Sequence, residues 1–201
     1  EPVAAVEVQW APAGADEAFP LPARLSAAST AGVFAFAGRL EEVARLDEIG
    51  KGAEAGGLWI ALISGEPGMG KTSLAAEAAR RAHGAGDAVV FGACPETVGA
   101  PYQPWITALA HLVTHAPEHV VAGLRAVHSA PLRALLPAVR DRIPVGETVD
   151  ADPDTERYLL LEAVVELLAR ASAHTPVIVV LDDLHWADAA TLGVLRHLVA
   201  A

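Results

Sequence analysis

The chain has 201 residues, of which 53% are hydrophobic and 19% are charged, and its net charge is −11. That length is enough for one domain with a substantial core. The acidic balance argues against a chain that grips nucleic acid through its own basic face. No apolar run is long enough to span a bilayer, and the amino terminus lacks the basic and apolar regions of a secretory signal. We therefore expect a soluble protein.

A single cysteine, Cys94, excludes an internal disulfide framework and suits the reducing cytoplasm, where we expect the protein to reside. Because it is isolated, we interpret Cys94 as a small core residue rather than a nucleophile. The only methionine is Met69, and residues 195–201 have a helical pattern with no capping glycine or proline. We expect the chain to be part of a longer polypeptide.

Residues 1–33 are rich in alanine and proline and show no sustained period. They are predicted to form a linker or extended arm from a preceding domain, and residues 34–201 the first part of a nucleotide-binding domain. Within that domain, apolar residues recur at helical spacing over 40–49, which predicts an amphipathic helix. Glycines 50, 52, 56 and 57 end this helix.

Residues 58–64 are a short apolar segment that predicts a buried strand, and residues 74–81 are rich in helix formers. Between them, residues 65–72 (GEPGMGKT) match the phosphate-binding pattern G-x-x-x-x-G-K-[ST]. A strand, a glycine turn and a helix point backbone N–H groups and a helix N-terminus at a phosphate.

Each part of the phosphate loop has a chemical role. Lys71 would reach the β- and γ-phosphates, and the hydroxyl of Thr72 would ligate Mg²⁺. The alternative is a glycine-rich turn whose lysine is merely solvated. The flanking strand and helix favour a nucleotide phosphate site.

Further along, residues 88–93 predict a second strand, followed by a loop over 94–104 at the sheet edge where ligands collect in parallel α/β folds. Helices are predicted over 105–115, 118–127 and 132–140. Asp152 and Pro153 then start another helix as N-cap and first residue. Its predicted buried stripe is Tyr158, Leu161, Val165 and Leu168.

Residues 177–181 (VIVVL) predict a buried strand that ends in paired carboxylates, Asp182 and Asp183. An aspartate at this strand end can hold the Mg²⁺ shell, which assigns Asp182 to the metal. The adjacent Asp183 can orient and deprotonate an attacking water. The alternative is that both acids only cap the helix that opens at residues 186–188.

Residues 181–188 (LDDLHWAD) closely resemble a signature of AAA-like ATPase domains in large bacterial regulators. These include LuxR-type regulators, SARP-type regulators with a bacterial transcriptional activator domain, and some nucleotidyl cyclases and kinases, all grouped with the signal-transduction ATPases with numerous domains (STAND). Three further segments resemble motifs of the same family: 36–42 (FAGRLEE), 64–72 (SGEPGMGKT), and 92–96 with 101–105 (GACPE and PYQPW). The resemblance covers residues 34–201.

This resemblance implies an α/β P-loop NTPase fold of the additional-strand type, a parallel sheet flanked by helices, cut off before the sensor strand and lid. It also implies the site. Gly38 and Arg39 would lie near the adenine and ribose, and Lys71 and Asp183 would be the catalytic residues. The residues expected to bind the phosphates of ATP or ADP are Glu66, Pro67, Gly68, Met69, Gly70, Lys71, Thr72 and Ser73.

Departures from the family pattern qualify these expectations. The second acid is Asp183 and not glutamate, which predicts slow hydrolysis. Glu96 is a weaker candidate for tuning the γ-phosphate. The strand that lies between the phosphate-loop strand and the Asp182 strand in such ATPases would follow residue 201, so we expect an unfilled place in the sheet. No arginine finger is assigned.

The function expected is that of an Mg²⁺-ATP-binding, slowly hydrolysing switch in a multidomain transcriptional regulator. Its expected partners are nucleotide and other domains of the same polypeptide, and it could also self-associate in a nucleotide-dependent way. DNA would be contacted only through a domain outside this segment. No membrane partner is expected. A non-hydrolysing nucleotide clamp and, less favoured, a small-molecule kinase are the alternatives. The absence of N-K-x-D disfavours a GTPase, and the absence of L-S-G-G-Q disfavours an ABC transporter ATPase.

Overall fold

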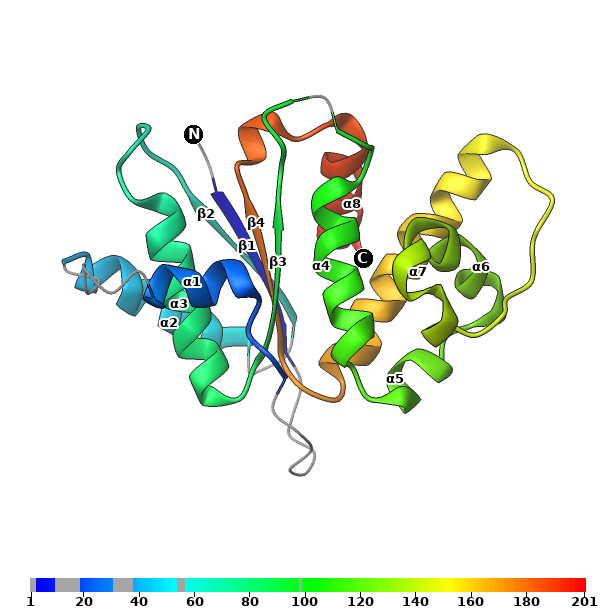
Figure 1. Ribbon diagram of the computed structural model, residues 1–201, viewed down its shortest axis with the longest axis horizontal. Helices are drawn as coiled ribbons and strands as arrows, with labels where there is room; N and C mark the ends of the chain where they lie inside the picture. Colours follow the sequence, from blue (N-terminus) through cyan, green and yellow to red (C-terminus); the bar gives the residue numbers. More distant parts are fainter. Residues whose placement is uncertain (1–2, 10–18, 31–37, 54–56, 98) are drawn as a thin grey trace.

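The computed structural model describes residues 3–9, 19–30, 38–53, 57–97 and 99–201. These residues form one sheet with helices on both faces (Figure 1). The strands are β1 (Val3–Gln9), β2 (Gly57–Ile63), β3 (Ala88–Ala93) and β4 (Val177–Asp182), in the spatial order β2-β1-β4-β3. An α/β fold with helices flanking the sheet confirms the predicted class.

The helices form two layers (Figure 1). One face of the sheet carries α1 (Ala23–Thr30), α2 (Leu40–Ala53) and α3 (Lys71–Ala85). The other carries α4 (Gln103–His115), α5 (Glu118–Ala122), α6 (Ala126–Leu135), α7 (Pro153–Ser172) and α8 (Ala189–Ala200), with 3₁₀ turns η1 (Pro137–Arg142) and η2 (Leu184–Trp186).

The sheet separates two hydrophobic cores because successive strand residues point to opposite faces. In β4, Val177, Val179 and Leu181 join the core under α4 and α7, while Ile178 and Val180 join the core under α3. All six residues of β4 are buried. This explains why the strand is a continuous apolar run in the sequence, as expected for a strand covered on both faces.

The strand directions place the carboxyl ends of β2, β3 and β4 at the same edge of the sheet. β3 pairs parallel with β4, whereas β1 pairs antiparallel with both β4 and β2. It follows that β2, β3 and β4 all run in the same direction. Their carboxyl ends therefore share one edge, the upper edge in Figure 1, where the phosphate loop follows β2 and Asp182 ends β4.

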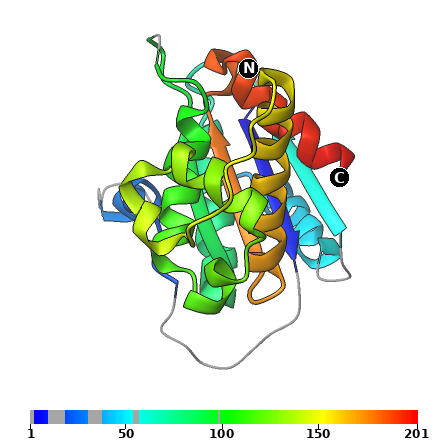
Figure 2. The same cartoon turned by 90° about the vertical axis from the view of Figure 1, so that its right-hand side faces the viewer.

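The expected gap between β2 and β4 is wrong, because β1 occupies it (Figure 2). Without a strand there, the facing backbone groups of β2 and β4 would have no ladder partners. The expected arm contains Pro2, Pro12, Pro20 and Pro22, but residues 3–9 contain no proline and include three valines. Together with α1, this strand differs from the extended linker expected for residues 1–33. A domain preceding them stays a prediction.

Most of the other predicted helices and strands are present, with ends that differ by a few residues from the prediction. The strands at 58–64, 88–93 and 177–181 and the helices over 40–49, 74–81, 105–115 and from residue 153 are confirmed. The helix expected over 118–127 is wrong, because α5 ends at Ala122 and α6 begins at Ala126. The helix expected over 132–140 is wrong, since α6 covers 126–135 and a 3₁₀ turn starts at Pro137. Pro137 cannot donate the backbone bond that would continue α6.

The buried stripe of α7 also differs from the prediction. Of the four predicted residues, Leu168 is buried, Leu161 and Val165 are only half-buried, and Tyr158 is exposed. The face of the helix that meets the core carries Ala163, Val164, Leu167 and Leu168. None of the described helices combines the length and apolar character needed to cross a bilayer.

Candidate functional site

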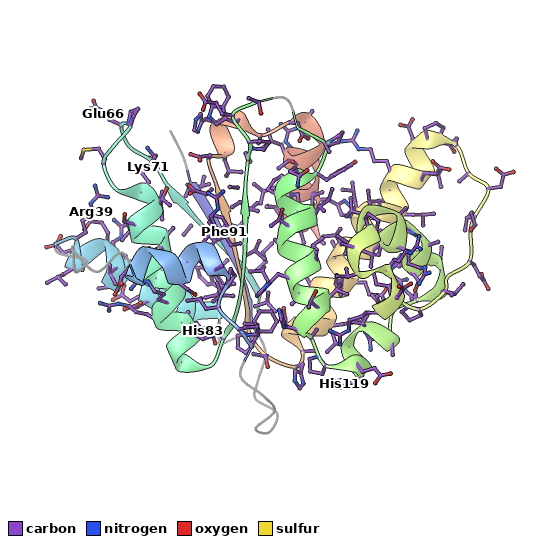
Figure 3. The ribbon with its side chains drawn as sticks, in the orientation of Figure 1. Arg39, Glu66, Lys71, His83, Phe91 and His119 are labelled. Carbon is purple, nitrogen blue, oxygen red and sulfur yellow. The ribbon has the colours of Figure 1, made fainter. Side chains whose placement is uncertain are left out.

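The phosphate loop connects β2 to α3 at the upper edge of the sheet, where Glu66 and Lys71 lie in Figure 3. The N-cap of α3 is Gly70, whose φ of 74° is in the left-handed region that side chains with a Cβ disfavour. The backbone N–H of Met69 donates to the carbonyl of Glu66 at 3.3 Å, which closes the turn. The N-terminus of α3, with its positive dipole end, therefore begins directly at the loop.

Lys71 is folded back over this loop. Its Nζ donates to the carbonyl oxygens of Gly65 at 3.0 Å and Glu66 at 3.1 Å. An ammonium group has three donors, and a phosphate oxygen is a stronger, charged acceptor than a carbonyl. The ammonium of Lys71 is thus held beside the loop, where it can exchange its carbonyl acceptors for the oxygens of a bound phosphate.

Thr72 and Asp182 meet across the gap between α3 and β4. The Thr72 hydroxyl donates to Oδ2 of Asp182 at 3.0 Å, with Oδ1 at 3.2 Å, and Asp182 is only 6% exposed. A hydroxyl and a carboxylate are the hard oxygen ligands that Mg²⁺ prefers. These two side chains therefore fit the magnesium role that the sequence assigns to them.

Asp183 follows directly after β4, and its side chain is half-exposed. It has a φ of 56°, its carboxylate is 52% exposed, and its backbone N–H donates to Oδ1 of Asp182 at 2.9 Å. A non-glycine residue in this conformation stores local strain and marks a functional site in many proteins. Neither acid caps α8. That role belongs to Asp188, which accepts from the Thr191 N–H at 2.7 Å, so the capping alternative fails.

Arg39 reaches the same loop from the start of α2. Its guanidinium donates to the carbonyl oxygen of Met69, which is thirty residues along the chain. Gly38 and Arg39 have φ values of 83° and 53°, a tight turn that aims the arginine at the loop. Residues 36–37 of this motif lie outside the described residues. The structure brings Gly38 and Arg39 to the phosphate loop, and their adenine and ribose roles stay predictions.

The loop that follows β3 supplies a buried thiol and an exposed acid. Cys94 is 4% exposed, and burial, with the nearby Asp188, Asp183 and Asp182, raises its pKa to about 11. Cys94 therefore remains a neutral thiol at physiological pH, as expected of a core residue. Glu96 is exposed on this loop.

The sequence does not reveal how this loop is fastened to α8. Trp105 is fully buried, and its Nε1–H donates to the carbonyl of Thr191 at 3.0 Å. Burial raises the pKa of Asp188, but hydrogen bonds from Thr191, Ala190 and the Tyr102 backbone outweigh it and lower that pKa overall. These contacts join α4 to α8 and hold the loop beside Asp182. The aromatic residues in 101–105 were the only sequence signal for them.

A separate cavity of about 340 Å³ lies between α2, α3 and the sheet. It is lined mainly by apolar side chains, and none of its lining residues comes from the phosphate loop at 65–73. Within the described part of the chain, no group of three or more histidines, cysteines or acids could hold a metal.

Comparison with known proteins identifies the family of the domain. A family model described as an AAA ATPase domain matches residues 35–201. Neither the curated proteins nor the solved structures gave a match. The matched region contains the phosphate loop, Thr72 and the Asp182–Asp183 pair. The chain belongs to the AAA ATPase domain family, a group of P-loop nucleotide-binding modules.

Proposed function

We propose that this domain binds Mg²⁺-ATP and hydrolyses it slowly, as a regulatory switch in a multidomain bacterial transcriptional regulator. The observation that carries the nucleotide role is the convergence of Lys71, Thr72 and Asp182 at one sheet edge. Lys71 is held over the phosphate loop, and the Thr72 hydroxyl lies 3.0 Å from Oδ2 of Asp182. Thr72 and Asp182 would hold Mg²⁺, and the ion would supply positive charge that offsets the negative charge of the phosphates.

The residues of this chain would divide the work. The N-terminus of α3 and Lys71 would bind the phosphates, while Thr72 and Asp182 would hold the ion. Asp183 would accept a proton from the attacking water, because its exposed carboxylate lies next to the metal ligand. An aspartate is one methylene shorter than a glutamate and reaches less far toward the water, which supports slow turnover.

The regulatory part of the proposal rests on the resemblance of four segments to LuxR-type and SARP-type regulators. In such a regulator, a bound γ-phosphate would favour one of two arrangements of the neighbouring domains. Partners would be other domains of the same cytoplasmic polypeptide, and DNA would be contacted only by such a domain. The net charge of −11 is consistent with a module that does not itself hold DNA.

Binding and phosphate release with fluorescent ATP and Mg²⁺ test this proposal, in wild type and in Asp183→Asn. The switch predicts that Asp183→Asn binds ATP normally and loses phosphate release. Tight binding without any hydrolysis by wild type would instead favour a structural nucleotide clamp. Phosphate transfer from ATP to an added metabolite, in place of water, would favour a kinase.

A further inference from the structure

His185 lies directly beside Asp183 at the carboxyl end of β4. Its Nδ1 is 4.0 Å from Oδ1 of Asp183, and its side chain is 25% exposed. The 3₁₀ turn η2 creates this arrangement, because the Trp186 N–H donates to the Asp183 carbonyl at 2.9 Å and turns the chain back. The left-handed conformation of Asp183 is thus what brings an imidazole to the carboxylate.

The backbone of Asp183 is hydrogen-bonded on both sides, and its side chain is 52% exposed. Its N–H is bonded to Asp182, and its carbonyl is bonded to the Trp186 N–H. The half-exposed carboxylate would need a partner to select one orientation. The ring of His185 packs against that of Trp186, with centroids 4.9 Å apart, which restricts the rotation of the imidazole.

We infer that His185 is a positioning residue for Asp183 in ATP hydrolysis, an inference that rests on the proposed function. The Nδ1–H would donate to Oδ1 of Asp183 and leave Oδ2 directed at the attacking water. A distance of 4.0 Å is longer than a hydrogen bond, but such contacts are often long without substrate and tighten in its complex. A base oriented by a third group is the general arrangement of an activated nucleophile.

The chemical step is balanced without a further reactant. The water oxygen forms a bond to the γ-phosphorus as the bridging bond to the β-phosphate breaks, and that electron pair leaves with ADP. The proton of the water passes to Oδ2 of Asp183 and then to solvent. His185 transfers no proton in this scheme, and its effect is confined to the orientation of the carboxylate.

Single-turnover hydrolysis and Mg²⁺-ATP affinity, measured separately, test this inference. Replacement His185→Ala should lower the hydrolysis rate about tenfold while ATP affinity stays within about twofold. In His185→Asn the amide nitrogen takes the place of Nδ1, so this variant should retain most of the rate. In His185→Gln the nitrogen takes the place of Nε2 instead, so it should behave like alanine. His174→Ala is the matched control, because its ring contacts His119 at the opposite end of the molecule (Figure 3).

A double-mutant cycle shows whether His185 acts through Asp183. Adding His185→Ala to Asp183→Asn should cause no further loss of rate, since the oriented carboxylate is already gone. A rate in His185→Ala equal to wild type, an asparagine variant no better than the glutamine variant, or an additive double mutant would each overturn the inference. Wild type that binds ATP but does not hydrolyse it would refute the hydrolytic function itself, and the role of His185 with it.

Discussion

The Thr72 hydroxyl and the Asp182 carboxylate, 110 residues apart in the chain, lie 3.0 Å apart at the carboxyl edge of the sheet. This contact joins the first turn of the phosphate-loop helix to the end of β4. It places two oxygen ligands where a single Mg²⁺ ion can use both. The proposed magnesium site therefore depends on the alignment of α3 with β4.

Replacing Thr72 with alanine should weaken nucleotide binding only when Mg²⁺ is present. The lost hydroxyl is the proposed metal ligand, so we expect the gain in ATP affinity on adding Mg²⁺ to fall about tenfold. Thr72→Ser keeps the hydroxyl and serves as the control. Titrations of ATP with Mg²⁺ and with EDTA measure this. An equal loss under both conditions would argue that Thr72 has no metal role.

Gly92→Ala should destabilise the domain. A Cβ at this position would lie 2.1 Å from the carbonyl oxygen of Pro104, so β3 or the start of α4 would have to move. Overpacking of this kind costs about 1–3 kcal/mol, and each kcal/mol lowers Tm by roughly 2–4 °C in a domain of this size. Thermal unfolding followed by circular dichroism measures the change.

Gly84→Ala is the matched control for Gly92→Ala. Gly84 lies inside α3, and a Cβ there would meet nothing within 4 Å. Alanine has the higher helix propensity, so this variant should be as stable as wild type or more stable, by up to about 1 kcal/mol. Equal destabilisation by both substitutions would show that the approach of Pro104 is not the cause.

The cap of α8 should contribute measurably to stability. Asp188 accepts hydrogen bonds from the N–H and the hydroxyl of Thr191, at 2.7 Å and 3.0 Å. Asp188→Ala should cost about 1 kcal/mol, whereas Asp188→Asn, which can still accept at the cap, should cost less. Urea unfolding gives both values. If asparagine and alanine were equally destabilising, the negative charge rather than the cap would be responsible.

Several parts of the site could be predicted from the sequence, because each is encoded locally. The phosphate loop is a contiguous pattern, and β4 is a continuous apolar run that ends at Asp182. The position of β1 could not be predicted, since residues 3–9 acquire their place only through pairing with β2 and β4. A strand whose partners lie about fifty and 170 residues away leaves little local signal.

The contact between His185 and Asp183 could not be predicted from the sequence either. It depends on the left-handed backbone of Asp183, and the motif alone suggests only that His185 shapes a turn. The bounds of α6 were missed for a different reason, since Pro131 lies inside that helix and reads as a helix breaker. Local rules therefore predicted the strands and the phosphate loop better than the helices beside them.

His115 on α4 should make stability depend on pH. Burial, together with the nearby His111 and Arg142, holds the pKa of His115 below its ordinary value. The unfolded chain then binds more protons than the folded one, so stability rises with pH. This contribution is fully present above the unfolded pKa near 6.5 and is lost as pH falls through the lower folded value.

Urea unfolding at several pH values between 7.5 and 5 checks this sign. Wild type should lose stability across the interval, and His115→Gln, which cannot be protonated there, should lose less. The rings of His111 and His115 have centroids 4.6 Å apart, so protonation of both would place like charges together. Identical slopes for wild type and His115→Gln would mean that His115 does not contribute.

The most direct test of the central claim is Mg²⁺-ATP binding by wild type and Lys71→Ala, with the chain's only other lysine, Lys51, replaced by alanine as the control. The phosphate site predicts that Lys71→Ala weakens binding at least about tenfold, a loss of roughly 1.4 kcal/mol, whereas Lys51→Ala binds like wild type. All three proteins should unfold at similar temperatures. Unchanged ATP affinity in a folded Lys71→Ala protein would contradict the assignment of this loop as the nucleotide site.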